Sequence, residues 1–365
     1  MTGTDPRQMN GGYQLDLFGA GPEPAPVAGP APAPGSVDLY ILNLSGGKDG
    51  LRAAALALEH ARASNAEERV YTVHASLGPL EWPGATANGT YYPGSSELAA
   101  LHSRALGVPP ERHIEVRRTR ELEGHRVPYD LLTFIAERGD WPWLGKARWC
   151  TGDWKTALIY GAFTSLVRFW KKDLGRPVVC ANVLGIRADE SRDRKNRPAL
   201  RTTTDNSARI VHEWSPAHHL STQAVKDWTD ERNLPHQWCY DSRPGAGDWQ
   251  GSSRCSCSLC VLASGRDLLL GVRRRPQLAE LYAHVERVRG VPFNPNTSMA
   301  ALIERAGEPG APDPGIVIED EGPEFDALKN AVDAALRKPP KRQRYVPRSG
   351  PVLPLCADCP EEAEQ

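Results

Sequence analysis

Apolar runs of strand length alternate with stretches of helical periodicity along the middle of the chain. The strand candidates are residues 37–44, 70–75, 114–116 and 177–185, and the helix candidates are residues 51–59, 95–106 and 156–169. Strands that alternate with helices are typical of a parallel sheet covered by helices on both faces. We therefore predict an α/β fold, in which ligands bind at the carboxyl ends of the strands.

Both ends of the chain differ from this pattern. Residues 1–36 include a run of proline and alanine that favours an extended linker. Residues 306–365 are again rich in glycine and proline and carry a basic stretch at 338–344, with one helix candidate at 325–336. We predict one ordered domain over residues 37–305 between two largely disordered segments.

Composition and charge exclude several classes of protein. The chain has 365 residues with 40% hydrophobic content, enough for a core, and its net charge of -1 provides no overall basic field for nucleic acid. No apolar stretch approaches the roughly 20 residues that span a bilayer. The N-terminus lacks the pattern of a signal peptide, so we expect a cytoplasmic protein without a membrane partner. Its eight cysteines then indicate metal ligands or reactive thiols.

A glycine-rich, charged loop joins the first predicted strand to the first predicted helix. It reads S-G-G-K-D-G at residues 45–50. Backbone N–H groups and a helix N-terminus converge on an anion at such a junction, while a serine hydroxyl and a lysine add a donor and a charge. The loop is not a Walker A motif. We predict phosphate binding, against the alternative of a tight turn with a helix cap, by Ser45, Gly46, Gly47, Lys48, Asp49 and Gly50.

A second polar segment follows the predicted strand 177–185. Residues 185–194 read G-I-R-A-D-E-S-R-D-R, so Arg187 and Arg194 lie close to carboxylates that include Glu190. Guanidinium groups bind phosphate or sulfate in a bidentate manner, and carboxylates hold Mg²⁺ that bridges phosphates. The alternative is a polar loop whose charges pair internally. Since strand ends share one edge of a parallel sheet, we expect Ser45, Ser76 and Arg187 to converge there.

The cysteines fall into three groups along the chain. Cys150 lies in R-W-C-T with a lysine at 155, which favours a thiolate, although a small buried side chain is the alternative. Cys239, Cys255, Cys257 and Cys260 contain a C-x-x-C spacing suited to structural zinc or an iron–sulfur cluster. Cys356 and Cys359 form a second C-x-x-C, which is a redox pair or a metal clip.

In their order, these motifs resemble the adenine nucleotide α-hydrolase group, and within it the phosphoadenosine phosphosulfate (PAPS) reductase-like proteins of phages and actinobacteria. The likeness covers roughly residues 37–305. It extends to the sulfur-transfer component of DNA phosphorothioation systems, an ATP pyrophosphatase with an iron–sulfur cluster. This chain departs from the pattern at Gly50, where serine or threonine is usual, and at Ser76, where aspartate is usual. The context of the C-terminal catalytic cysteine of true PAPS reductases is absent.

The resemblance implies a nucleotide-binding domain over residues 37–305, with a cysteine-rich part at 239–264. ATP or PAPS with Mg²⁺ is the implied ligand, held by the loop 45–50 together with Ser76, Arg187 and Arg194. Catalysis is assigned to Lys48, Arg187 and Glu190. The implied ligands of an iron–sulfur cluster or zinc are Cys150, Cys239, Cys257 and Cys260, with Cys255 in reserve.

The resulting functional hypothesis is an enzyme that cleaves an adenine nucleotide at the α-phosphate, adenylates an acceptor and releases pyrophosphate, with sulfur transfer as one use. Its partners would include a sulfur-donor protein or nucleic acid. Two alternatives stay open at this point. One is a sulfonucleotide reductase acting on PAPS, and the other is a non-catalytic module that binds nucleotides or nucleic acid.

Overall fold

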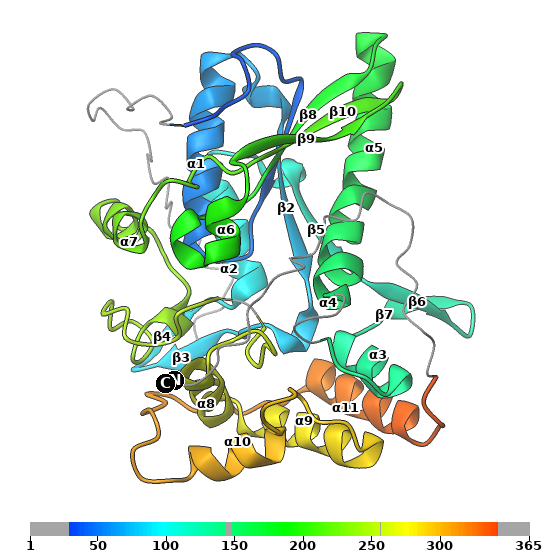
Figure 1. Ribbon diagram of the computed structural model, residues 1–365, viewed down its shortest axis with the longest axis vertical. Coiled ribbons are helices and arrows are strands. Elements are labelled where there is room, and N and C mark those ends of the chain that lie inside the picture. The colour runs from blue at the N-terminus through cyan, green and yellow to red at the C-terminus, as the bar shows by residue number, and fades with distance from the viewer. Residues whose placement is uncertain (1–28, 143–147, 256, 342–365) are drawn as a thin grey trace, which may run out of the picture.

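The computed structural model describes residues 29–142, 148–255 and 257–341. Within these ranges the centre is a six-stranded sheet with the order β5-β2-β1-β8-β10-β9 (Figure 1). Neighbouring strands are parallel except for β9, which pairs antiparallel with β10 at one edge. This arrangement confirms the predicted α/β class with a mostly parallel sheet. The strands are β1 Leu39–Asn43, β2 Val70–Ser76, β5 His113–Arg117, β8 Val178–Val183, β9 Leu200–Asp205 and β10 Arg209–Trp214.

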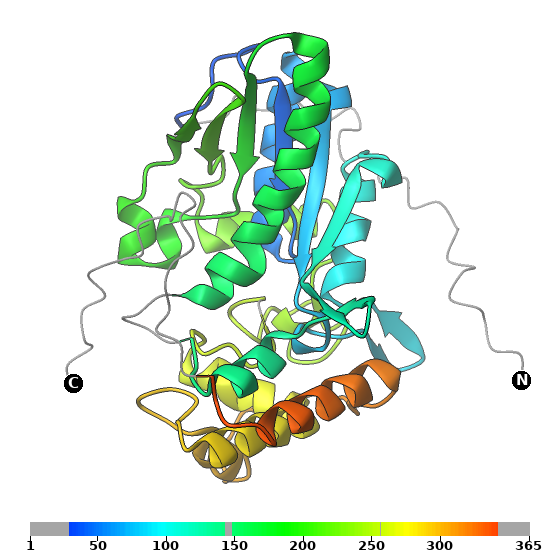
Figure 2. The ribbon, with the colours of Figure 1, turned by 90° about the vertical axis from the view of Figure 1, so that its right-hand side faces the viewer.

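Helices cover both faces of the sheet, because side chains alternate between the faces along each buried strand. Tyr40 and Leu42 of β1 pack against α1 (Lys48–Ala63), in a core that α2 (Ser95–Ala105) and α7 (Thr222–Glu231) extend. Leu39 and Ile41 point to the opposite face, where they pack with Phe163 of α5 (Ala157–Leu174). Figure 2 shows α5 lying along its own side of the sheet.

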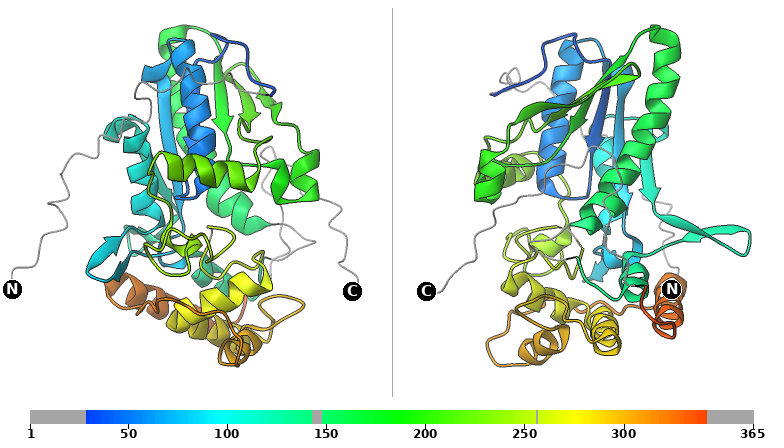
Figure 3. Two further views of the ribbon diagram at one scale, coloured as in Figure 1. Left: turned by 90° about the vertical axis from the view of Figure 1, so that its left-hand side faces the viewer. Right: turned by 45° about the vertical axis from the view of Figure 1, so that its right-hand side comes forward.

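A second layer of helices lies below the sheet, at the carboxyl ends of the strands (Figures 1 and 3). Leu77 and Leu80, which come directly after β2, share one core with Leu328 and Val332 of this layer. The loops that follow the strands therefore lead into the helical layer. Its helices are α3 Leu131–Arg138, α8 Gly265–Arg274, α9 Pro276–Arg289, α10 Met299–Ala306 and α11 Pro323–Leu336.

Two hairpins and several short elements complete the fold. The β6–β7 hairpin projects from the side of the molecule (Figure 3). None of the helices in the described parts of the chain is long and apolar enough to cross a membrane. The remaining elements are β3 Ala85–Ala87, β4 Thr90–Tyr92, β6 Thr119–Leu122, β7 His125–Pro128, α4 Trp149–Thr151, a π-helical turn at Gly152–Thr156 and α6 Arg192–Asn196.

Two differences from the predicted boundaries affect the candidate site and the extent of the packed chain. Helix α1 begins at Lys48 and not at residue 51, so half of the glycine loop forms the first helical turn. The chain also stays packed beyond residue 306, where composition predicts a largely disordered segment. Phe325, Leu328 and Val332 are buried in the helical layer, since their spacing places them on one face of α11. Residues 1–28 and 342–365, with Cys356 and Cys359, lie outside the described residues.

Candidate functional site

The order of the strands places one crevice between the ends of β1 and β8. The chain leaves β1 through α1 to reach β2 on one side, and it enters β8 on the other side after α5 on the opposite face. Such a reversal is a topological switch point, where open α/β sheets bind their ligands. The two polar segments that the sequence singles out, at 45–50 and 185–194, follow these two strands. The fold thus brings both segments to the same place.

The two loops touch through glycines. A Cβ atom built on Gly185 would lie 2.5 Å from the backbone nitrogen of Gly50, which is too close for any side chain. At Gly50 a Cβ would lie 3.1 Å from the carbonyl oxygen of Asn43. Below this contact, the Asn43 amide nitrogen donates to the Asn182 side-chain oxygen at 2.7 Å and so ties β1 to β8. The close approach of the two loops therefore requires glycine at 185, whereas a side chain at 50 would need the Asn43 carbonyl to shift by a few tenths of an ångström.

The glycine loop has the geometry of an anion cradle. Gly46 adopts a left-handed conformation with φ of 74°, and a Cβ there would lie 3.0 Å from the carbonyl oxygen of Ser95. Gly47 is the N-cap residue of α1, and no side chain caps this helix. The first N–H groups of a helix have no partner within the helix. These groups at the start of α1 are consequently placed to bind an anion such as phosphate.

Lys48 is held beside the cradle. Its side chain is only 4% exposed, and Nζ donates to the Asp49 carboxylate at 2.9 Å. Nζ also lies 5.1 Å from the centre of the Tyr240 ring. The Tyr240 hydroxyl in turn lies 3.3 Å from a Cβ built on Gly47. The cation is thus preorganised between an acid and an aromatic ring, next to the backbone that would receive the phosphates.

Arg187 reaches the glycine loop, as the sequence predicts, but it binds protein groups there. The side chain is 2% exposed, and Nε donates to Asp49 Oδ1 at 2.6 Å. The other guanidinium nitrogens of Arg187 donate to the Leu220 carbonyl at 3.3 Å and to the Thr222 hydroxyl at 3.1 Å. Arg187 therefore fixes the first turn of α1 through Asp49. In the same segment, Glu190 accepts a hydrogen bond from the guanidinium of Arg194, so these two predicted site residues pair with each other.

Ser76 lies at the end of β2, but its hydroxyl is used locally, because it accepts a hydrogen bond from Gly78 N at 3.2 Å. The more distinctive group nearby is a buried pair of residues that were not among the predicted site residues. His74 bonds the Leu44 carbonyl at 2.9 Å and Glu81 at 3.1 Å. Burial lowers the pKa of His74, but Glu81, the Leu44 carbonyl and Glu115 together outweigh this effect, so the net shift of the pKa is upward. The signal in the sequence was His74 itself, a polar residue within the apolar strand β2.

The four predicted metal ligands fall into two groups. Burial raises the pKa of the Cys150 thiol, and negative charge at Cys260 raises it further. Cys150 and Cys257 both pack against the core of the helical layer, and the pKa of Cys257 is raised by burial and by its electrostatic interaction with Cys260 and Cys150. Cys239 instead lies in a small core cluster against which Cys255 packs. We call Cys150, Cys257 and Cys260 the three-cysteine group.

Lys155 lies beside the three-cysteine group. It belongs to the π-helical turn Gly152–Thr156, a feature that is frequent at functional sites. Burial lowers the pKa of Lys155, but negative charge at Cys257, Glu81, Cys260 and Cys150 more than offsets this, so the net shift is upward. No set of three or more histidine, cysteine or acidic side chains is arranged to hold a metal ion within residues 29–142, 148–255 and 257–341.

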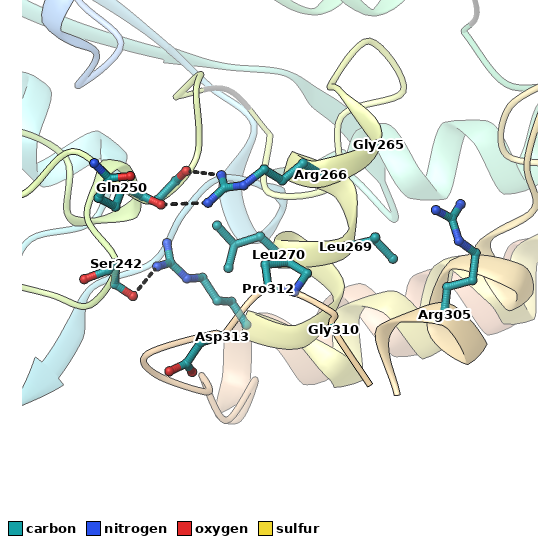
Figure 4. A pocket seen from close by; sticks show the side chains of 12 residues that line it. Ser242, Gln250, Gly265, Arg266, Leu269, Leu270, Arg305, Gly310, Pro312 and Asp313 are labelled. Carbon is teal, nitrogen blue, oxygen red and sulfur yellow. Dashed lines mark hydrogen bonds between the residues drawn. The ribbon is translucent and has the colours of Figure 1, made fainter. Parts of the chain in front are cut away.

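A surface pocket of about 600 Å³ lies in the helical layer beside α8, whose residues Arg266, Leu269 and Leu270 line it (Figure 4). Arg266 donates to the carbonyls of Gln250 and Gly251 at its rim, at 2.8 and 2.6 Å. The lining includes neither the glycine loop nor the three-cysteine group. We place the candidate site at the switch point, because the residues with relevant chemistry gather there.

The chain matches no protein-family model and no curated protein sequence.

Proposed function

We propose that the chain binds an adenine nucleotide at the glycine loop and cleaves it at the α-phosphate with release of pyrophosphate. The observation that supports this most directly is the uncapped start of α1 at the switch point, where Gly46 turns the backbone and Lys48 supplies a fixed charge. A helix N-terminus and a lysine together suit a chain of phosphates. Transfer to an acceptor would leave the acceptor adenylated.

Each residue has a distinct part in this proposal. The backbone N–H groups of the loop would hold the departing pyrophosphate, and Lys48 would stabilise negative charge that develops on it. Arg187 would act as a positioning residue, since it holds Asp49 and with it the first turn of α1. Glu190 and Arg194 would position the second loop through their ion pair.

Mg²⁺ belongs to the proposal as the partner of the nucleotide. It is usually held by one or two carboxylates together with substrate phosphates and water. Asp49 is the carboxylate of the cradle, but its oxygens already bind Lys48 and Arg187. Because both Asp49 oxygens are occupied, a Mg²⁺ ion that arrives with the nucleotide would be held mainly by phosphate oxygens and water.

We propose that the three-cysteine group binds an iron–sulfur cluster or zinc, and that the bound metal draws together three thiols that are not arranged around a metal site in the described structure. Thiolates suit both, and Lys155 would compensate their negative charge. A cluster would supply sulfur-transfer chemistry, whereas zinc would stabilise the fold. Cys239 is separated from this group, so we propose that the fourth ligand predicted from the sequence is not part of the metal site.

Metal content tests this assignment directly. We expect Cys150→Ser to lose most of the bound metal, because it removes one of three neighbouring thiols. Cys239→Ser should retain the metal content of the wild type. The measurement is iron, sulfide and zinc per chain, together with the visible absorption spectrum, on protein purified without oxygen. Equal loss in both variants would restore Cys239 to the ligand set, and a wild type without metal would refute the site.

The nucleotide proposal is tested by pyrophosphate release. We expect Lys48→Met to lower the rate of release from Mg-ATP by about 100- to 1000-fold, the usual cost of removing one group that stabilises transition-state charge. Lys171→Met is the matched control, because Lys171 lies on α5 and donates to the Ser207 carbonyl away from the site. The assay includes sulfide and nucleic acid as candidate acceptors.

Other products would identify the alternatives. Sulfite released from PAPS would establish a sulfonucleotide reductase. Binding of ATP without turnover, under every acceptor condition, would establish a non-catalytic binding module. Failure of the wild-type chain to bind ATP or PAPS would refute a nucleotide site at the glycine loop altogether.

A further inference from the structure

The surface pocket beside α8 has a positively charged lining that the proposed nucleotide chemistry does not use. Its volume of about 600 Å³ lies in the usual range for pockets that bind small molecules. Three arginines, Arg266, Arg274 and Arg305, line it together with a single acidic residue, Asp313. The glycine loop and the three-cysteine group are not part of this lining. The pocket is therefore a candidate site separate from the switch point.

The arginines of the pocket lack acidic partners within the described ranges. Arg274 is completely buried, yet its guanidinium donates to four backbone carbonyls and to no carboxylate. Arg266 donates to two carbonyls, and the side chain of Arg305 has neither an ion pair nor a hydrogen bond among the described residues. The buried Arg187 and Arg275, in contrast, each pair with an acid. The lining thus carries positive charge that no ion pair compensates, which favours an anionic ligand.

The two exposed arginines lie at different ends of the pocket. Arg266 belongs to the first turn of α8, and Arg305 belongs to the last turn of α10. Figure 4 shows their guanidinium groups well apart, on either side of Leu269. The lining also includes the apolar side chains of Leu270 and Pro312. The pocket therefore offers one accessible cation at each end and an apolar wall between them.

Arg266 is held in place at its end of the pocket and still has donors to spare. It binds the carbonyls of Gln250 and Gly251 at 2.8 and 2.6 Å. A guanidinium has five N–H groups, so the others remain for a ligand. Two parallel hydrogen bonds from one guanidinium match the two oxygens of a carboxylate. Arg266 can consequently bind a carboxylate without giving up its contacts with the backbone.

We propose that the surface pocket binds a linear dicarboxylate. One carboxylate binds Arg266, the other binds Arg305, and the apolar chain between them packs against Leu269, Leu270 and Pro312. One guanidinium at each end matches the charge and the planar shape of one carboxylate. A phosphate group carries close to twice that charge and would exceed the single accessible cation at each end.

Asp313 does not oppose this ligand directly. Its Oδ1 accepts a hydrogen bond from Gly315 N at 2.9 Å. In Figure 4 its carboxylate lies apart from the guanidinium groups of Arg266 and Arg305. The two ends of the pocket therefore keep their positive character.

Calorimetric titration of the full-length protein tests the proposal. The probes are succinate, adipate, suberate and sebacate, each compared with the monocarboxylate of the same length. We expect at least one dicarboxylate to bind about 10-fold or more tightly than its monocarboxylate, the usual gain from a further hydrogen bond between charged groups. Arg305→Met should abolish this preference, because only one end of the ligand is then bound. Arg305→Lys should restore part of it.

The matched control is Arg168→Met on the exposed part of α5, which should keep the preference of the wild type. Circular dichroism confirms that the variants are folded. Equal affinity for dicarboxylates and monocarboxylates in the wild type, or a preference that survives Arg305→Met, would overturn the proposal. Binding that is lost in Lys48→Met and kept in Arg305→Met would place the dicarboxylate on the glycine loop, which also overturns it.

Inorganic pyrophosphate distinguishes the two classes of anion. If it binds more tightly than every dicarboxylate and Arg305→Met weakens it, the pocket is a phosphate site and the dicarboxylate is rejected. None of these measurements requires nucleotide binding or turnover. Failure of the proposed function would therefore leave the test of the pocket intact.

Discussion

Replacing Arg187 with methionine should lower the free energy of unfolding by about 3–5 kcal/mol, as is typical when one partner of a buried ion pair is removed. Arg187 is 2% exposed and donates to Asp49, and it also binds the Leu220 carbonyl and the Thr222 hydroxyl. The variant removes the Arg187 donor from all three groups, although Asp49 keeps its hydrogen bond from Lys48. Urea denaturation followed by circular dichroism measures the change. This single guanidinium joins α1, the loop after β8 and the start of α7.

The control for Arg187→Met is Arg168→Met. Arg168 is exposed on α5, so its replacement should change stability by no more than about 0.5 kcal/mol. A double-mutant cycle with Asp49→Asn separates the contribution of the Arg187–Asp49 ion pair from that of the other Arg187 contacts. Such a cycle is needed because the effects of residues in one hydrogen-bond network are not additive. Equal destabilisation by both arginine variants would show that the Arg187 contacts do not hold the site together.

Replacing Arg275 with methionine should have an effect of similar size, about 3–5 kcal/mol. Arg275 is completely buried and pairs with buried Asp320. It also donates to the Glu81 carbonyl at 2.6 Å and to Ser258 Oγ at 2.9 Å. One side chain thus connects the chain beyond residue 306 to the loop after β2 and to the cysteine-rich loop. Thermal and urea unfolding of the full-length variant report the loss.

Asp320→Asn removes the charge of the other partner in the Arg275–Asp320 ion pair. Arg287→Met, on the exposed face of α9, is the matched control. We expect the first to destabilise strongly and the second to leave stability unchanged within about 0.5 kcal/mol. Wild-type stability in both Arg275→Met and Asp320→Asn would mean that residues 307–341 contribute little to the fold.

Local features of the chain predicted much of the fold. The apolar runs at 37–44, 70–75 and 177–185 form β1, β2 and β8, because runs of strand length between helices specify buried parallel strands without help from distant residues. Glycine at 46 and 47 likewise predicted a loop between β1 and α1. The start of α1 at Lys48 was missed, since Gly47 is its N-cap and no capping side chain marks the boundary.

The grouping of charges and thiols depended on contacts between distant segments. The spacing of the cysteines grouped Cys239 with the C-x-x-C pair. In the structure, the chain returns at Ser252 onto Cys239, and Cys255 packs against the core cluster that contains Cys239. The polar segment at 185–194 indicated charges near phosphate. In the structure, the loop at Gly185 packs against Gly50, and Arg187 forms an ion pair with Asp49 instead.

By itself, then, the sequence determined the α/β class, the strand–loop–helix junction at 45–50 and the types of side chain around it. Those properties follow from periodicity and backbone preference over a few residues. The tertiary structure decided which ions pair, which thiols meet and where the packed chain ends. Glycine- and proline-rich composition beyond residue 306 indicated disorder, yet burial of Leu328 and Val332 and the Arg275–Asp320 pair hold that segment in the helical layer. Such contacts join residues far apart in the chain, and no local pattern encodes them.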